Sequence, residues 1–172
     1  MKIGAPGESD PNEQRVALVP ETVERLVKAG HEISIGEGAG TTAGFPNSAY
    51  TGVGATMGTA GDIAGSVDIF VHVQSPTPSE LSAMKKGTIV VGLLNARTDS
   101  AGVSALAAAG VTALSMELVP RIARAQRMDV LSSQASIAGY KAALLAANSL
   151  GKYLPMMMTA AGTIPPAKVL VL

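Results

Sequence analysis

A chain of 172 residues is long enough for one well-buried α/β domain and a short additional segment, but too short for two complete domains. Its 13 basic residues balance its 13 acidic ones, so the composition provides no basic surface for phosphate backbones, and we expect no nucleic-acid partner. The absence of cysteine excludes disulfides and Cys-ligated zinc, and because His31 and His72 lie in different segments, we expect no metal site.

Short apolar runs recur along the chain, with helical segments between them. Proline at position 20 and glycine at position 30 fit the first turn and the left-handed stop of a helix. Helices are predicted over residues 20–30, 79–86 and 100–109, and strands over residues 2–5, 32–35, 68–73, 88–94, 112–116 and 168–172.

Alternating strands and helices with short connections favour parallel strands joined by right-handed crossovers. The run over residues 88–94 is apolar throughout, as expected of a strand that is buried on both faces. The sequence therefore predicts that residues 1–128 form a doubly wound α/β domain, Rossmann-like or flavodoxin-like, with three layers.

The run Gly38-Ala39-Gly40-Thr41-Thr42-Ala43 satisfies the loose dinucleotide pattern GxGxxG/A. That pattern requires a helix whose N-terminus faces the pyrophosphate, and Gly44 and Pro46 would interrupt a helix that began here. We therefore interpret this run as an ordinary glycine-rich loop.

Three charged residues, Glu8, Glu13 and Arg15, follow the first predicted strand, where loops of parallel sheets line the usual ligand crevice. They are equally compatible with a small polar ligand, whose anionic group Arg15 would bind, and with a solvated salt-bridge group. His72 lies within an apolar strand, and a single histidine there is more often structural than a base.

Residues 120–134 concentrate hydrogen-bonding side chains in a chain of which only 15% is charged. Arg121, Gln126 and Ser132 supply guanidinium, amide and hydroxyl groups, which complement a carboxamide such as that of nicotinamide. Asp129 is compatible with binding the same ligand or with capping the helix that follows. The residues alone predict a polar, planar ligand without deciding which.

A helix of about six turns is predicted after this polar run, because apolar residues recur at heptad spacing from Val130 until Gly151 and Pro155 end the pattern. Its many alanines predict that it packs between two bodies. We interpret residues 129–166 as an interdomain helix and connector, and residues 167–172 as the first strand of a second domain of which the rest is absent.

Several motifs resemble one known family. Those nearest the N-terminus are residues 3–8 (IGAPGE), 13–20 (EQRVALVP) and 26–31 (LVKAGH), and those further on are 120–134 (PRIARAQRMDVLSSQ), 138–142 (AGYKA) and 159–163 (TAAGT). The first three look like the signature shared by alanine dehydrogenases and the NAD(H)-binding component of proton-translocating NAD(P) transhydrogenase. The others resemble the transhydrogenase branch.

The resemblance implies an oxidoreductase subunit that binds NAD(H) and exchanges a hydride with NADP(H) on a partner component, coupled to proton translocation. It places Arg121, Gln126, Asp129 and Ser132 around the nicotinamide as positioning residues, with no catalytic acid or base. It also implies a homodimer with NADP-binding and membrane components as partners. With neither a bilayer-spanning run nor a secretory signal in the sequence, we expect a cytoplasmic protein held peripherally at the inner or plasma membrane.

Two alternatives remain. Alanine dehydrogenases carry a lysine where Gln74 stands and a histidine where Asn95 stands, so an alanine-dehydrogenase-like NAD-dependent oxidoreductase is disfavoured. The resemblance also implies that residues 167–172 are the first strand of an NAD-binding Rossmann domain. The sequence stops before the glycine turn that holds the pyrophosphate in this family, so we expect the fragment alone to bind NADH poorly and to be inactive. The same observation leaves open a non-catalytic dimerisation or interaction module.

Overall fold

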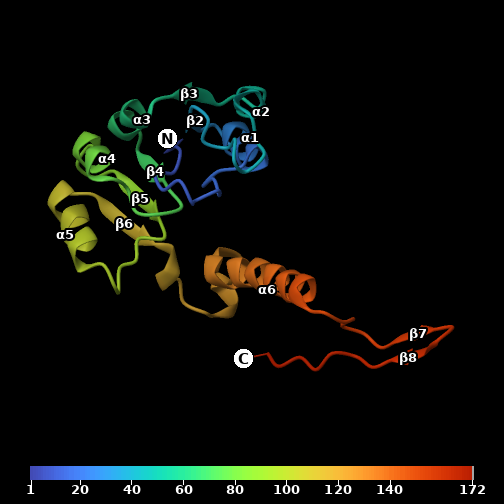
Figure 1. Ribbon diagram of the computed structural model, residues 1–172. Helices are drawn as coiled ribbons and strands as arrows, with labels where there is room; N and C mark the ends of the chain where they lie inside the picture. Colours follow the sequence, from blue (N-terminus) through green and yellow to red (C-terminus); the bar gives the residue numbers. More distant parts are fainter. Residues whose placement is uncertain (172) are drawn as a thin grey trace. The chain divides into compact units, whose positions relative to one another are not determined.

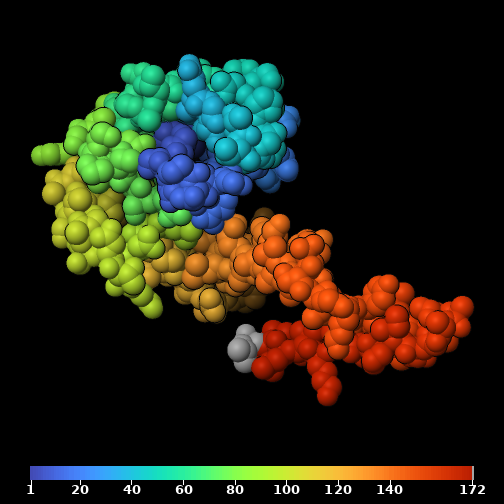
Figure 2. Space-filling model, viewed as in Figure 1, coloured from blue at the N-terminus to red at the C-terminus, as the bar shows by residue number. Residues whose placement is uncertain are grey.

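The computed structural model describes residues 1–171, and the chain divides into two units, Met1–Met128 and Asp129–Leu172. The first unit contains a six-stranded sheet with its helices, and the second contains one long helix and a two-stranded hairpin (Figure 1). Figure 2 shows the side chains of the first unit, coloured blue to yellow-brown, and those of the second, coloured orange to red.

The sheet of the first unit is parallel throughout, in the order β3-β2-β1-β4-β5-β6. Its strands are β1 (Lys2–Ala5), β2 (Glu32–Gly36), β3 (Thr56–Gly58), β4 (Ile69–Val71), β5 (Ile89–Gly92) and β6 (Thr112–Ser115). This is the strand order of doubly wound dinucleotide-binding folds, and it confirms the predicted fold class. The order reverses between β1 and β4, which are neighbours in the sheet although β2 and β3 separate them in sequence.

Helices cover both faces of this sheet, because strand side chains alternate between the faces. On one face, Ile3 and Ile33 pack with Tyr50, which is fully buried. On the other, Phe70 packs with Ile63 and the rest of a second apolar cluster. The helices are α1 (Pro20–Lys28), α2 (Asn47–Thr51), α3 (Ala60–Ser66), α4 (Pro78–Ala83) and α5 (Ser100–Ala109).

Local capping explains why α5 has the bounds predicted for it. The side chain of Asp99 accepts a hydrogen bond from the Gly102 backbone at 2.9 Å, which satisfies a free N–H group of the first turn. Gly110 follows the last turn with a φ of 68°, the left-handed conformation that glycine adopts without strain. Residues at both ends therefore set the length of this helix.

Three short elements between residues 47 and 66, namely α2, β3 and α3, were not predicted. They contain 5, 3 and 7 residues, which is too little for a helical or strand periodicity to show in the sequence. Before them, residues 37–44 form turns, and no helix begins within the run Gly38–Ala43. This agrees with the interpretation of that run as an ordinary loop.

The second unit confirms the long helix and corrects the segments that follow it. α6 (Val130–Ser149) has 20 residues, none of them buried. Residues 156–166 were interpreted as a connector, but β7 (Met157–Thr159) and β8 (Gly162–Ile164) form an antiparallel hairpin. Gly162, with a φ of 125°, allows the tight turn, and the strands are too short to show alternation.

The strand predicted over residues 168–172 is not present over residues 168–171, and Leu172 lies outside the described residues. A strand forms only when a neighbouring strand shares its backbone hydrogen bonds, and no strand within residues 1–171 pairs with this segment. The assignment of this segment to an NAD-binding domain stays a prediction. None of the helices in residues 1–171 is both long and apolar enough to cross a membrane.

Two glycines of the first unit provide a matched pair of stability predictions. A methyl group on Gly36 would lie 2.7 Å from the Gly7 nitrogen, and backbone atoms cannot move aside easily, so Gly36→Ala is expected to lower the free energy of unfolding by about 1–3 kcal/mol. Gly61 lies within α3 with no atom near its would-be methyl group, so Gly61→Ala is expected to raise it by about 1 kcal/mol. Urea unfolding measures both, and shifts of the same sign would contradict this difference in packing.

Candidate functional site

The loops that leave the carboxyl ends of β1 and β4 meet where the strand order reverses, which is the usual place of a ligand crevice in such sheets. Glu8, in the first loop, joins them. Its Oε1 accepts a hydrogen bond from the Val73 backbone N–H at 2.7 Å, and its Oε2 accepts one from that of Gln74 at 3.1 Å. One carboxylate after the first strand therefore fixes the backbone that follows the fourth.

His72 lies directly after β4 and is buried between two carboxylates. Its Nδ1 lies 2.7 Å from Glu8 Oε2, and its Nε2 lies 3.6 Å from Glu80 Oε1. The Nε2 contact is too long for a hydrogen bond and the Nδ1 contact does not have hydrogen-bond geometry, so both are charge contacts. Burial alone lowers the pKa of His72, but the two carboxylates more than offset this and raise the pKa to about 9. At neutral pH His72 is therefore a buried cation, which fits the structural role that the sequence favoured.

Glu80 was missed as a member of this cluster, although the sequence carries a signal for it. Thr77-Pro78-Ser79-Glu80 is a capping box at the start of α4, in which the Glu80 backbone donates to Thr77 Oγ1 and Thr77 N donates to Glu80 Oε2 at 2.7 Å. Burial alone raises the pKa of Glu80, but its contacts with His72 and Thr77 lower it below the ordinary value. The cap thus holds a carboxylate beside the imidazolium.

The charge of His72 predicts a stability that depends on alkaline pH. Its folded pKa of about 9 exceeds the ordinary value of 6.5, so its contribution is complete below pH 6.5 and is lost as the pH rises through 9. We expect the free energy of unfolding to fall by about 3 kcal/mol across this window. Urea unfolding at pH values from 6 to 10 checks this, and His72→Gln should flatten the dependence. A wild-type curve as flat as that of the variant would contradict the assignment.

Glu13 binds two other side chains of the crevice. Its carboxylate accepts from Arg15 Nε at 2.8 Å and Nη2 at 2.6 Å, and from Gln74 Nε2 at 2.8 Å. The hydrogen bonds from Arg15, partly opposed by burial and assisted by Gln74, lower the pKa of Glu13 to about 2. Only 7% of the Glu13 side chain is exposed, whereas 40% of the Arg15 side chain is, so the two form a partly buried salt bridge. Binding of a small anionic ligand by Arg15 stays a prediction.

A further carboxylate, Glu117, holds the loop after β5. Glu117 lies in the short 3-10 helix η1 (Met116–Leu118), and it accepts hydrogen bonds from Leu94 N at 3.2 Å and Ala96 N at 2.8 Å. Ser115 Oγ donates to the same carboxylate at 2.6 Å. Between the two bonded backbone groups stands Asn95, with a φ of 53°. No sequence pattern signals this arrangement, since the loop and Glu117 lie about twenty positions apart.

Two of the four predicted ligand residues belong to the first unit. Arg121 lies just before the second 3-10 helix, η2 (Ala123–Met128), and Gln126 lies within it. Both side chains are exposed. Ala125 is the buried residue of this helix, so the apolar side anchors the segment while the polar side chains face outward. This arrangement leaves both side chains accessible to a ligand.

The other two predicted residues, Asp129 and Ser132, belong to the second unit and form the N-cap of α6. Ser132 N donates to Asp129 Oδ1 at 2.9 Å, and Ser132 Oγ donates to Oδ2 at 2.6 Å. Of the two roles that the sequence left open for Asp129, capping is therefore present in the structure. Binding of a ligand by this pair stays a prediction.

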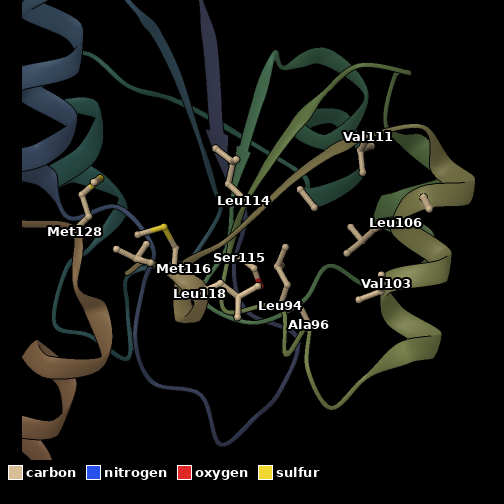
Figure 3. A pocket seen from close by; sticks show the side chains of 13 residues that line it. Leu94, Ala96, Val103, Leu106, Val111, Leu114, Ser115, Met116, Leu118 and Met128 are labelled. Carbon is tan, nitrogen blue, oxygen red and sulfur yellow. The ribbon is translucent and has the colours of Figure 1, made fainter. Parts of the chain in front are cut away.

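One groove of the first unit is apolar. It has a volume of about 580 Å³, and side chains from α5, β6 and the segment after β6 converge on it (Figure 3). Its lining includes Leu94, Val103, Leu106, Leu114, Leu118 and Met128. Such a lining lacks the donors and acceptors that a carboxamide requires, so the groove is not the polar site. Among residues 1–171, no cluster of three or more His, Asp or Glu side chains has an arrangement that could hold a metal ion.

Comparisons with known proteins show relatives along the whole chain. Residues 4–138 match the family described as alanine dehydrogenase/PNT, N-terminal domain. An NAD(P) transhydrogenase subunit alpha protein of Rhodospirillum rubrum is 44% identical over 99% of this chain, and alanine dehydrogenase of Bacillus subtilis is 32% identical over 88%. The solved structure of transhydrogenase from Sinorhizobium meliloti superposes with a TM-score of 0.91 over 97% of this chain, at 44% identity.

The chain is shorter than each of these relatives. It covers 46% of the Rhodospirillum protein, 39% of the Bacillus protein and 50% of the solved Sinorhizobium chain. What those whole proteins do therefore involves residues that have no counterpart here.

Proposed function

Because this chain belongs to the alanine dehydrogenase/PNT family, we propose that it is the N-terminal part of a transhydrogenase α subunit, which binds NAD(H) and passes a hydride between NADH and NADP(H) coupled to proton translocation. The observation that carries the choice within the family is the side chain at position 74. Gln74 donates to Glu13 in the crevice at 2.8 Å, where the alanine dehydrogenases carry a lysine for an oxo-acid. An amide supplies neither the cation nor the acid that alanine oxidation requires.

In this role the polar run acts by positioning. When bound, NADH supplies the hydride, and its transfer needs no proton from the protein. The guanidinium of Arg121, the amide of Gln126 and the hydroxyl of Ser132 each match an acceptor or a donor of a carboxamide, so each suits the role of orienting the ring. Asp129 fixes Ser132 through the helix cap. Such positioning would raise the rate by keeping the bound ring in the geometry from which transfer occurs.

A reconstitution assay tests the proposal. The full-length protein that contains this chain is combined with the NADP-binding and membrane components of a transhydrogenase, and hydride transfer from NADH to NADP⁺ is followed by absorbance. We expect transfer in the complete mixture and none when any component is omitted. A complete, correctly assembled mixture that transfers no hydride would refute the proposal.

The partners and location follow from the same proposal. We propose a homodimer that docks on NADP-binding and membrane components, so that the protein sits at the cytoplasmic side of the inner or plasma membrane without entering it. Light scattering of the full-length protein and co-sedimentation with membranes that contain the other components measure these two properties separately.

The alternative, an alanine-dehydrogenase-like enzyme, is compatible with Arg15 but is not favoured by it. Arg15 stands where those enzymes bind the substrate carboxylate, but both branches of the family share it. NAD-dependent oxidation of alanine by the full-length protein decides between them. Oxidation of alanine together with failure of the reconstitution assay would favour the alternative.

A further inference from the structure

Asn95 stands out in the first unit by its backbone. Among residues 1–171 it is the one residue other than glycine with a positive φ, 53°, and it is exposed in the loop that follows β5. Its carbonyl accepts bonds from Thr98 and Asp99, but within the described residues no hydrogen bond reaches its side-chain amide. Left-handed backbone at a non-glycine residue costs free energy, and such residues gather at ligand sites.

Hydrogen bonds to Glu117 stabilise the backbone conformation of Asn95. The Glu117 carboxylate binds the backbone N–H groups immediately before and after Asn95, at 3.2 Å and 2.8 Å. Burial alone raises the pKa of Glu117, but hydrogen bonds from Ser115 and from the Ala96 backbone lower it below the ordinary value, so the carboxylate remains charged. A charged acceptor of two flanking N–H groups fixes the backbone from which the Asn95 side chain projects.

Glu117 also connects this loop to the polar run. β5 and β6 are parallel neighbours, so the loop that carries Asn95 and the segment that carries Glu117 leave the sheet at the same end. The segment continues from Glu117 through Pro120 to Arg121 and, in η2, Gln126, all within the first unit. The hydrogen bonds to Glu117 therefore connect the loop of Asn95 to the segment that bears two of the proposed nicotinamide residues.

We infer that the Asn95 side chain hydrogen-bonds a neutral polar group in the nicotinamide riboside half of NAD(H), and that Glu117 positions it. This inference rests on the proposed function. A neutral amide both donates and accepts, so it suits the ring carboxamide or a ribose hydroxyl, whereas the pyrophosphate calls for cationic or backbone donors. Asn95 is thus a further binding residue, and Glu117 a positioning residue that acts through it.

The test uses Asn95→Gly in the full-length protein. Glycine adopts a φ of 53° without strain, so this change removes the amide and keeps the loop. We expect the dissociation constant for NADH, measured by calorimetry, to rise about three- to tenfold, as for a lost hydrogen bond, with the urea midpoint not lowered. An unchanged dissociation constant, in a protein whose wild type transfers hydride normally, overturns the inference. A wild type that fails in the reconstitution assay overturns the proposed function instead.

A double substitution tests the positioning role of Glu117. Glu117→Ala alone should weaken NADH binding to a similar extent, but in the Asn95→Gly background it should add little, because the group through which it acts is gone. Purely additive effects overturn this role. Asp99→Ala is the matched control, since it removes an acidic cap from α5 beside the same loop and should lower stability without changing NADH affinity.

The acetylpyridine analogue of NADH locates the contact. This analogue keeps the ring carbonyl but lacks the amide nitrogen. An effect of Asn95→Gly that disappears with the analogue supports a bond to the carboxamide nitrogen. An effect that persists supports a bond to the ring carbonyl or to a ribose hydroxyl.

Discussion

Alanine in place of Glu8 is expected to lower the free energy of unfolding by about 3–5 kcal/mol. The substitution leaves the buried imidazolium of His72 without the closer of its two carboxylates. It also leaves the backbone N–H groups of Val73 and Gln74 without their acceptor in a partly buried loop. Urea unfolding at pH 7, followed by circular dichroism, measures the loss.

A surface carboxylate provides the control for this prediction. Glu24 pairs with Lys28 one turn further along α1, where the Lys28 side chain is 71% exposed, and Glu24→Ala should cost less than about 1 kcal/mol. Glu8→Ala has the larger effect on the free energy of unfolding because it leaves the charge of His72 buried without its nearer carboxylate. Similar losses for the two substitutions would show that His72 is solvated or neutral when Glu8 is absent.

Gln126→Ala is expected to lower the rate of hydride transfer by about a hundredfold in the complete complex, provided that the proposed function holds. The amide orients the nicotinamide carboxamide, and a ring that is free to rotate spends most of its time in geometries from which transfer is slow. Single-turnover absorbance measurements separate this rate from the binding of NADH. The stability of the protein should not change, because the side chain is exposed.

Arg124→Ala is the matched control for Gln126, since Arg124 is also exposed in η2. No role at the nicotinamide site is proposed for Arg124, and its removal should leave the single-turnover rate within about twofold of the wild type. A hundredfold loss in both variants would indicate that η2 itself had been disturbed. No loss in Gln126→Ala would remove this residue from the nicotinamide site.

The sequence predicted the fold well where elements are long or capped. α5 and α6 carry periodic apolar residues or a cap at the start, and five of the six strands are runs of apolar β-branched or small residues. β3 and the hairpin of β7 and β8 escaped because strands of three residues contain too few positions for alternation to be visible. Their existence depends on pairing partners, which a local pattern does not reveal.

The candidate site divides in the same way. The polar run was visible because its residues are neighbours in sequence, and the structure places Arg121 and Gln126 on one exposed segment. The contacts of Glu8 with residues 72–74 and of Glu117 with residues 94–96 join positions that lie about 20 to 65 residues apart. Such contacts follow from strand order, so spacing along the chain could not have revealed them.

The all-parallel strand order has a consequence for the way this chain folds. β1 is synthesised before the other strands, yet one of its two neighbours is β4, with Ile3 paired to Ile69, so its second edge stays open until about seventy residues have been made. No pair of strands in this sheet can form as a local hairpin, and each pairing must first close a long loop. Slow folding is therefore expected, with an aggregation-prone apolar strand exposed early. The newly made first unit should depend on chaperones more than a helical bundle of the same length would.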